Sequence, residues 1–98
     1  MPDPADSNPT TIEDWRAQFD RIDQAILALL GERQTFSLRL GAWKRERGIP
    51  IVNEDRERAL IKHLADSHPE GLSAEAIERI WNAILTASKE VQTLTVSE

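Results

Sequence analysis

The chain has 98 residues, a length typical of one small domain, and 40% of them are hydrophobic. Its 17 acidic residues outnumber its 12 basic ones, so the net charge is −5 and no nucleic-acid-binding surface is expected. Without cysteine, and with histidines that lack zinc spacing, the sequence predicts neither a disulfide nor a metal site. With no apolar run long enough for a membrane and no signal-peptide core, we expect a cytoplasmic protein.

The first predicted element follows a tail, residues 1–11, that is rich in proline, aspartate and serine and is expected to be disordered. Thr10 and Glu13 have the spacing of a capping box, which predicts that a helix begins here. This helix is predicted over residues 12–47 and is stopped by glycine and proline. Apolar residues recur along it at steps of three and four: Ile12, Trp15, Phe19, Ile22, Ile26, Leu29, Leu30, Phe36 and Leu40.

Two shorter helices are expected downstream, within a helical domain predicted to span residues 12–98. Asn53 can cap the second helix, which ends near residues 67–69, and Ser73 can cap the third. No alternating apolar run and no hairpin signal is present, so the predicted fold class is all-α, with three helices per chain. The apolar faces of the two helices are Leu60, Ile61 and Leu64, then Ile77, Ile80, Trp81, Ile84 and Leu85.

The first helix is too long for a compact chain of this size. Its 36 residues would make a rod of roughly 54 Å, whereas a compact chain of this length is on the order of 30 Å across. Two shorter helices cannot cover an apolar stripe of that length. We therefore predict a two-fold, largely helical homodimer, in which a second copy covers the stripe. A coiled coil with an unrelated partner is the alternative, and the width of the stripe favours the bundle.

Polar residues replace apolar ones near the end of this stripe. Continued from Leu30 at the same steps, the stripe runs through Arg33, Ser37, Leu40 and Lys44. Two cations therefore stand where the pattern predicts core. Burying an unpaired charge costs several kcal/mol, and a fold accepts such a cost mainly where an anion binds.

Arg33 and Lys44 lie within roughly 20° of one helix face and about 16 Å apart along the axis, so their side chains can converge on a small molecule. Arg16 lies roughly 25 Å before Arg33 and about 100° away from that face. It cannot reach the same pocket within one chain. In an antiparallel dimer, Arg16 of one chain can approach Arg33 and Lys44 of the other.

The second and third helices supply further polar groups. Arg56 and Glu57 lie in the first turn of the second helix, and Ser88 and Gln92 share one face of the third. Each residue alone has an ordinary structural explanation, such as a cation that extends from a dimer interface to solvent. Together with the cations of the first helix they suit a small dianion that also carries a hydroxyl. The set contains no nucleophile–base pair and no glycine-rich phosphate loop.

The type and spacing of these polar residues resemble those of the all-helical chorismate mutase family, over roughly residues 12–95. The resemblance implies an intertwined dimer of three-helix chains that converts chorismate to prephenate by an intramolecular rearrangement, with no cofactor and no covalent intermediate. The residues that carry it are Arg16, Arg33, Lys44, Arg56, Glu57, Ser88 and Gln92.

The resemblance also implies a role for each residue. Arg33 and the partner's Arg16 would bind the two substrate carboxylates. Lys44 and Gln92 would donate hydrogen bonds to the ether oxygen whose bond breaks. The predicted catalytic residues are therefore Lys44, Gln92 and Arg33. A pericyclic step needs orientation of the substrate and donors aimed at the developing negative charge, and this set suits both needs.

The remaining residues would hold the rest of the substrate. In the family resembled, Glu57 would accept a hydrogen bond from the ring hydroxyl, with help from the backbone near Asn53, and Ser88 and Arg56 would complete the carboxylate contacts. Two positions depart from the family pattern. Asn53 stands where aspartate is frequent, and Trp43 stands where small residues are frequent.

Three alternatives stay open. Relatives on this scaffold split isochorismate into salicylate and pyruvate, or rearrange 4-amino-4-deoxychorismate. Glu57 argues against the lyase, because a carboxylate suits a donor at ring position four. It suits an ammonium as well as a hydroxyl, so the amino-substrate mutase is not excluded. The third alternative is a helical dimer that binds the ligand without turnover.

Overall fold

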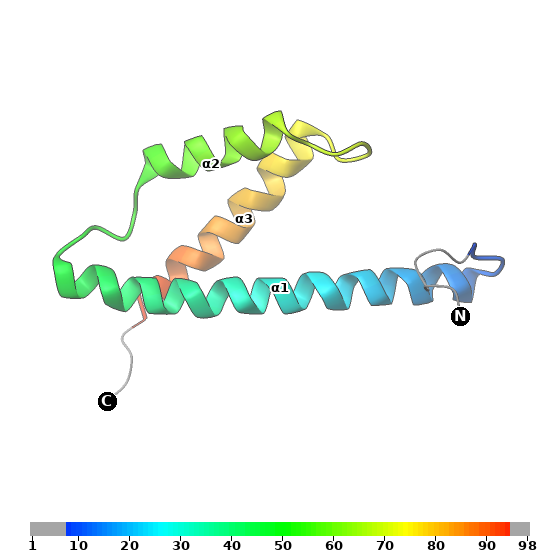
Figure 1. The fold of residues 1–98 in the computed structure, drawn as a ribbon, viewed down its shortest axis with the longest axis horizontal. Coiled ribbons are helices and arrows are strands. Elements are labelled where there is room, and N and C mark those ends of the chain that lie inside the picture. Colours follow the sequence, from blue (N-terminus) through cyan, green and yellow to red (C-terminus); the bar gives the residue numbers. More distant parts are fainter. Residues whose placement is uncertain (1–7, 95–98) are drawn as a thin grey trace. The chain divides into compact units, whose positions relative to one another are not determined.

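A computed structural model describes residues 8–94, which form three α-helices and no strand (Figure 1). They are α1 (Ile12–Arg47), α2 (Glu54–Asp66) and α3 (Ala74–Gln92). The predicted all-α class and the predicted bounds of the long helix are confirmed. Most of the tail predicted at residues 1–11 lies outside the described residues, as does the segment 95–98. Neither α1, α2 nor α3 is long and apolar enough to cross a membrane.

The chain divides into two compact units, Met1–Glu32 and Arg33–Glu98. The described part of the first unit consists of residues 8–32, most of them in α1. The second unit contains the last part of α1 together with all of α2 and α3. A single helical domain over residues 12–98 therefore stays a prediction, and the candidate site described below belongs to the second unit alone.

The capping box of α1 lies one residue later than predicted. Thr11 Oγ1 accepts a hydrogen bond from the backbone N–H of Asp14 at 3.1 Å, and Asp14 Oδ2 accepts one from the backbone N–H of Thr11 at 3.2 Å. Because the helix begins at Ile12, Thr11 is its N-cap and Asp14 its third residue. Hydrogen bonds from Thr10, backbone first and then side chain, and weaker ones from Thr11 lower the pKa of Asp14.

The other helix ends agree with the sequence. Asn53 Oδ1 accepts from the backbone N–H of Arg56 at 3.0 Å, and Ser73 Oγ accepts from that of Ala76 at 3.1 Å. Both predicted N-caps are thereby confirmed. Gly48 follows α1 with φ at +65°, a conformation that glycine adopts without strain, and it turns the chain towards α2.

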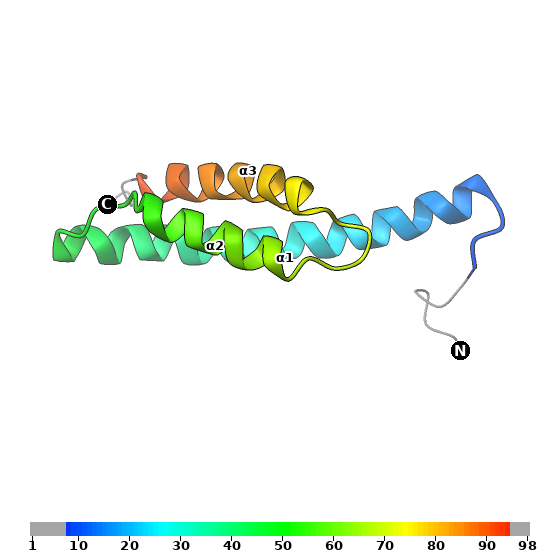
Figure 2. The same cartoon turned by 90° about the horizontal axis from the view of Figure 1, so that it is seen from above.

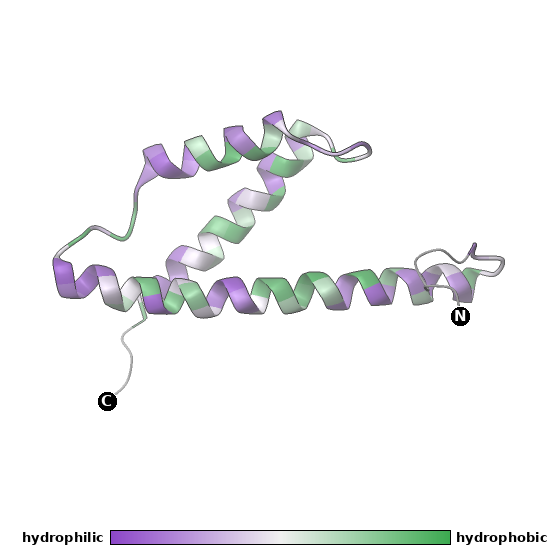
Figure 3. Ribbon diagram, in the orientation of Figure 1, coloured by the Kyte–Doolittle hydropathy of each residue, from purple (hydrophilic) through white to green (hydrophobic). Residues whose placement is uncertain are grey.

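Hydrophobic burial within one chain is limited to α3 and its neighbours. α2 and α3 pack against each other near the loop that joins them, and they diverge towards the start of α2 and the end of α3 (Figure 1 and Figure 2). Ile77 and Leu85 of α3 are 2% and 8% exposed. By contrast, the apolar stripe of α1, green in Figure 3, is exposed except for Leu30. Its exposed members are Ile12, Trp15, Phe19, Ile22, Ile26, Leu29, Phe36 and Leu40.

α3 runs from the loop after α2 to α1 and reaches α1 at its own C-terminal end (Figure 1). The crossing is very close, since a Cβ atom on Gly41 would lie 2.3 Å from the carbonyl oxygen of Gln92. Arg45 Nη1 donates to that same oxygen at 2.7 Å, and Gln34 Nε2 donates to the carbonyl of Ala87 at 3.1 Å. A glycine at position 41 is therefore a condition for this approach of α1 and α3.

Replacing Gly41 with alanine should destabilise the protein by about 1–3 kcal/mol, because the added methyl group forces the end of α3 away from α1. Gly31→Ala is the matched control, since a Cβ there meets nothing within 4 Å. It should be neutral or stabilise by up to about 1 kcal/mol, as alanine is the better helix former. Urea unfolding at one fixed protein concentration measures both. Equal stability of the two variants would contradict the close crossing.

Candidate active site

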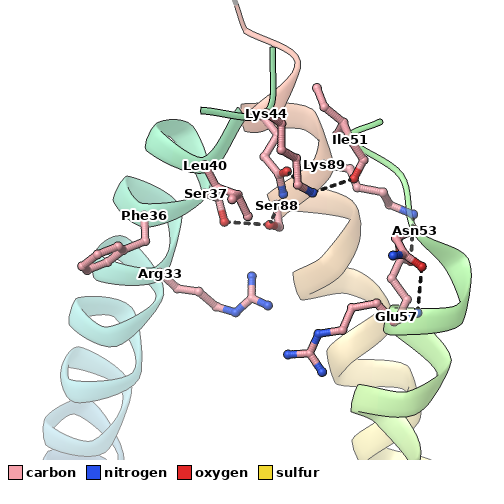
Figure 4. Close-up of a pocket in the computed structure, with 12 residues that line it drawn as sticks. Arg33, Phe36, Ser37, Leu40, Lys44, Ile51, Asn53, Glu57, Ser88 and Lys89 are labelled. Carbon is pink, nitrogen blue, oxygen red and sulfur yellow. Dashed lines mark hydrogen bonds and ion pairs between the residues drawn. The ribbon is translucent and has the colours of Figure 1, made fainter. Parts of the chain in front are cut away.

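A pocket of about 450 Å³ lies in the second unit, between the last part of α1, the start of α2 and the end of α3 (Figure 4). Its volume is within the range usual for small-molecule sites. The side chains around it are mostly polar or charged, and each helix contributes some of them. The lining residues are Arg33, Phe36, Ser37, Leu40, Lys44, Ile51, Asn53, Arg56, Glu57, Ser88, Lys89 and Gln92.

A continuous chain of hydrogen bonds organises one wall of the pocket. Lys44 Nζ donates to the carbonyl oxygen of Ile51 at 3.1 Å and to Oε1 of Gln92 at 3.3 Å. Gln92 Nε2 donates to Ser88 Oγ at 3.1 Å, and Ser88 Oγ lies 2.7 Å from Ser37 Oγ. Ser37, Ser88 and Gln92 are buried. The chain of hydrogen bonds therefore fixes the orientation of the Gln92 amide and of the Lys44 ammonium group.

These hydrogen bonds leave donors available for a ligand. An ammonium group has three N–H donors, and Lys44 uses two of them within the described residues. A carboxamide has two, and Gln92 uses one on Ser88. Lys44 and Gln92 contact each other, so their remaining N–H groups belong to one small region of the pocket. The arrangement can bind an oxygen that carries or gains negative charge.

Two cations of the pocket have no partner within the described part of the chain. The guanidinium groups of Arg33 and Arg56 make no hydrogen bond and no ion pair with any residue of the segment 8–94, although the backbone N–H of Arg56 takes part in the cap of α2. Figure 4 shows Arg33 extending from α1 into the space between the helices. Guanidinium groups pair with carboxylates through parallel hydrogen bonds, so these two are suited to a ligand with carboxylate groups.

The opposite end of the pocket holds its one lining carboxylate. Lys89 Nζ donates to Glu57 Oε1 at 3.1 Å, and both side chains are partly buried. Asn53 lies beside Glu57, with its side-chain oxygen engaged in capping α2. The cap fixes the first turn of α2 and with it the position of Glu57, whose backbone N–H donates to the Asn53 carbonyl at 3.1 Å.

The balance of charge in the pocket is opposite to that of the whole chain. Four cationic side chains and one carboxylate line it, whereas the chain carries a net charge of −5. A local positive pocket in an acidic protein attracts small anions and not extended polyanions such as nucleic acid. The groups present can bind, orient and donate hydrogen bonds.

Most of the site residues predicted from the sequence lie together in this pocket. Arg16 does not: it is exposed on the part of α1 that belongs to the first unit, and it is not among the lining residues. Trp43 is outside the pocket as well, with 47% of its surface exposed and Arg47 stacked 4.1 Å from its ring centroid. The predicted residues that line the pocket are Arg33, Lys44, Asn53, Arg56, Glu57, Ser88 and Gln92.

Sequence reasoning missed two polar residues of the pocket. The sequence places Ser37 on the stripe of the first helix but gives no reason to include it in the site. A buried serine needs a polar partner, and the structure shows that this partner is Ser88. Lys89 follows Ser88 directly and gave no periodic signal, because its role depends on the position of α2. Sequence reasoning also missed the importance of Gly41, because the need for a glycine arises only from the close approach of α3 to α1 at that position.

Comparison with known proteins agrees with this geometry. The family model described as chorismate mutase type II matches residues 15–93, which include every lining residue of the pocket. The chain belongs to the chorismate mutase type II family. Asn53 caps α2 as an aspartate would, because aspartate and asparagine are equally good N-cap residues.

Two curated relatives match over most of the chain. It is 31% identical over 80 residues to a bifunctional chorismate mutase/prephenate dehydratase of Aquifex aeolicus, and 26% identical over 78 residues to the T-protein of Haemophilus influenzae. The alignments cover 78% and 79% of this chain but only 22% and 21% of those proteins. The chain thus spans about a fifth of the length of the curated relatives it matches.

Two solved structures share the fold. Chorismate mutase of Thermus thermophilus in Form II superimposes with a TM-score of 0.83 at 27% identity, covering 88% of this chain and 98% of the other. Form I gives a TM-score of 0.75 at 30% identity, with 79% and 96% covered. These structures, unlike the curated relatives, are matched along nearly their whole length.

The bond between Ser37 and Ser88 predicts coupling between the two positions. Ser88→Ala leaves the Ser37 hydroxyl and the Gln92 amide buried without their partner, which should cost about 1–3 kcal/mol of stability. The double variant Ser37→Ala, Ser88→Ala should cost less than the sum of the single changes by about 0.5–3 kcal/mol. Urea unfolding of the four proteins completes the cycle. Strictly additive losses would contradict the hydrogen bond.

Proposed function

We propose that this protein is a chorismate mutase, which rearranges chorismate to prephenate within one molecule. The observation that supports it most is the pocket itself. Two guanidinium groups without partners in the segment 8–94, those of Arg33 and Arg56, share it with the Lys44–Gln92 pair and its unused donors. Chorismate carries two carboxylates, an ether oxygen and a ring hydroxyl, and the pocket offers a complementary group for each. The family and the names of its relatives support the same reaction.

The proposed mechanism is orientation combined with electrostatic stabilisation. Arg33 and Arg56, with Ser88, hold the carboxylates, so that the flexible side arm is kept over the ring and the entropy cost of that geometry is met on binding. Lys44 and Gln92 donate to the ether oxygen, where negative charge grows as its bond to carbon breaks. Because the amide and the ammonium are already oriented by Ser88 and Ile51, they need little reorganisation during the reaction.

We further propose that the working form is a homodimer. Within one chain the apolar stripe of α1 is left exposed, from Ile12 at 56% to Phe36 at 58%, and few of the described side chains are buried. Contiguous apolar surface of this extent is usual at an interface and unusual on a monomer. A second copy would cover the stripe and bring the partner's Arg16 to the end of the pocket where Arg33 would bind a carboxylate of the substrate. A cytoplasmic location stays a prediction of the sequence. We also propose a role in aromatic amino-acid biosynthesis, which the name of the relative from Aquifex aeolicus supports.

Arg33→Ala should abolish most turnover of chorismate with little loss of stability, because it removes a cation from a polar pocket and breaks no hydrogen bond or ion pair within the described chain. The assay measures chorismate consumption and prephenate formation, with 4-amino-4-deoxychorismate and isochorismate run in parallel. Arg58→Ala is the matched control, since Arg58 is exposed on α2 and pairs with neighbouring carboxylates of that helix.

The other outcomes separate the alternatives. Release of pyruvate from isochorismate would move the chain to the lyases, and preference for the amino substrate would move it to the second mutase. Binding of chorismate by the wild-type protein without turnover would contradict an enzyme. An Arg33→Ala variant that fails to fold would indicate that the residue is structural.

Mixing two inactive variants tests the shared site. Arg16→Ala and Arg33→Ala homodimers each lack one carboxylate ligand at every site, whereas a hybrid dimer has one site that lacks both and one that is intact. Mixtures should therefore regain part of the wild-type turnover as subunits exchange. Mass spectrometry of differently labelled chains verifies the exchange. No recovery despite proven exchange would overturn the proposed contribution of Arg16 across the interface.

A further inference from the structure

The ion pair between Lys89 and Glu57 sets the electrostatic character of one end of the pocket. Lys89 Nζ lies 3.1 Å from Glu57 Oε1, and the side chains retain 34% and 23% of their exposure. Lys89 extends from α3 to the side where Asn53 and Glu57 lie (Figure 4). Unlike the exposed pairs Lys62–Asp66 and Arg58–Asp55 on α2, this pair joins two helices and lines the pocket.

The pair changes what Glu57 can accept. An isolated carboxylate attracts a ligand ammonium and a ligand hydroxyl alike, and attracts the ammonium more strongly. Once Lys89 occupies one oxygen of Glu57, the net charge of the pair is zero, and the second oxygen still accepts a hydrogen bond from a neutral donor. A ligand ammonium bound there would lie close to the ammonium of Lys89 in a partly buried site. Two like charges close together in a partly buried site weaken binding by about tenfold or more.

We propose that Lys89 is a specificity-determining residue, which makes the pocket select a substrate whose ring carries a neutral hydroxyl and reject the analogue that carries an ammonium at that position. The inference rests on the proposed function, in which Glu57 faces the ring substituent. It also addresses what the sequence left open, because Glu57 considered alone suits 4-amino-4-deoxychorismate as well as chorismate. The charge environment of Glu57 decides between them.

The test compares kcat/KM for chorismate and for 4-amino-4-deoxychorismate in wild-type protein and in variants. Lys89→Met keeps the length of the side chain and removes its charge, and Lys89→Gln is a second neutral variant in case the first is poorly folded. Lys89→Arg restores the charge. Lys62→Met is the matched control, because Lys62 forms an exposed ion pair with Asp66 and does not line the pocket.

We expect the wild-type protein to prefer chorismate and the neutral variants to shift the ratio of kcat/KM towards the amino substrate by about tenfold or more. Lys89→Arg and Lys62→Met should keep the wild-type ratio. A merely structural role would lower kcat/KM for both substrates together and leave their ratio unchanged. An unchanged ratio in both neutral variants, or a wild-type preference for the amino substrate, would overturn the proposal.

Calorimetric measurement of Kd for the same two compounds distinguishes failure of the Lys89 proposal from failure of the proposed function. If the wild-type protein binds both compounds without turnover, and the ratio of their Kd values still shifts on Lys89→Met, the enzyme assignment fails while the selectivity of Lys89 stands. Turnover of chorismate with no shift in either ratio leaves the enzyme assignment intact and overturns the role of Lys89. Absence of binding to either compound would overturn both.

Discussion

The pocket depends on one close contact between helices, the approach of the Gln92 carbonyl to Gly41. No other residue type leaves room for that oxygen, since a Cβ at position 41 would lie 2.3 Å from it. The same oxygen accepts a hydrogen bond from Arg45 at 2.7 Å, and this bond holds the end of α3 against α1. Because of this crossing, Lys44, about one turn of α1 after Gly41, reaches the side chain of Gln92. Ser37, about one turn before Gly41, reaches the side chain of Ser88. The close backbone contact at Gly41 therefore determines how the hydrogen-bond donors of Lys44 and Gln92 are arranged in the pocket.

The pocket combines groups that are paired with groups that are not. Lys44, Ser88 and Gln92 bond to one another, and this fixes them before any ligand arrives. The guanidinium groups of Arg33 and Arg56 have no such partners among the described residues, and under the proposed function a ligand would supply them. Catalysis by orientation needs both kinds of group, because fixed donors stabilise the developing charge and unpaired cations provide binding energy. The division follows from the folded arrangement, since all five residues are polar and look alike in the sequence.

The sequence predicted the elements of the fold better than their contacts. Helical periodicity, capping residues and the terminating Gly48 were sufficient for all three helices, because these signals are local. The capping box at Thr11 was missed by one residue, since Thr10 and Thr11 are chemically equivalent there and only the helix start at Ile12 selects between them. Ser37, Lys89 and Gly41 required knowledge of which helix faces meet. Such contacts come from segments far apart in the chain, and periodicity carries no information about them.

Asn53 links the fold and the chemistry of the site. As the N-cap of α2 it fixes the first turn, which carries Arg56 and Glu57 into the pocket, and aspartate would do so equally well. The two residues differ in charge, however. With the neutral asparagine at this position, Glu57 is the one carboxylate that lines the pocket, and a single cation, Lys89, is enough to balance it. An aspartate would add a second negative charge at the same end and favour a cationic ring substituent. Asparagine at position 53 therefore preserves the cap of α2. Under the proposed function it would act in the same direction as Lys89, towards a neutral hydroxyl.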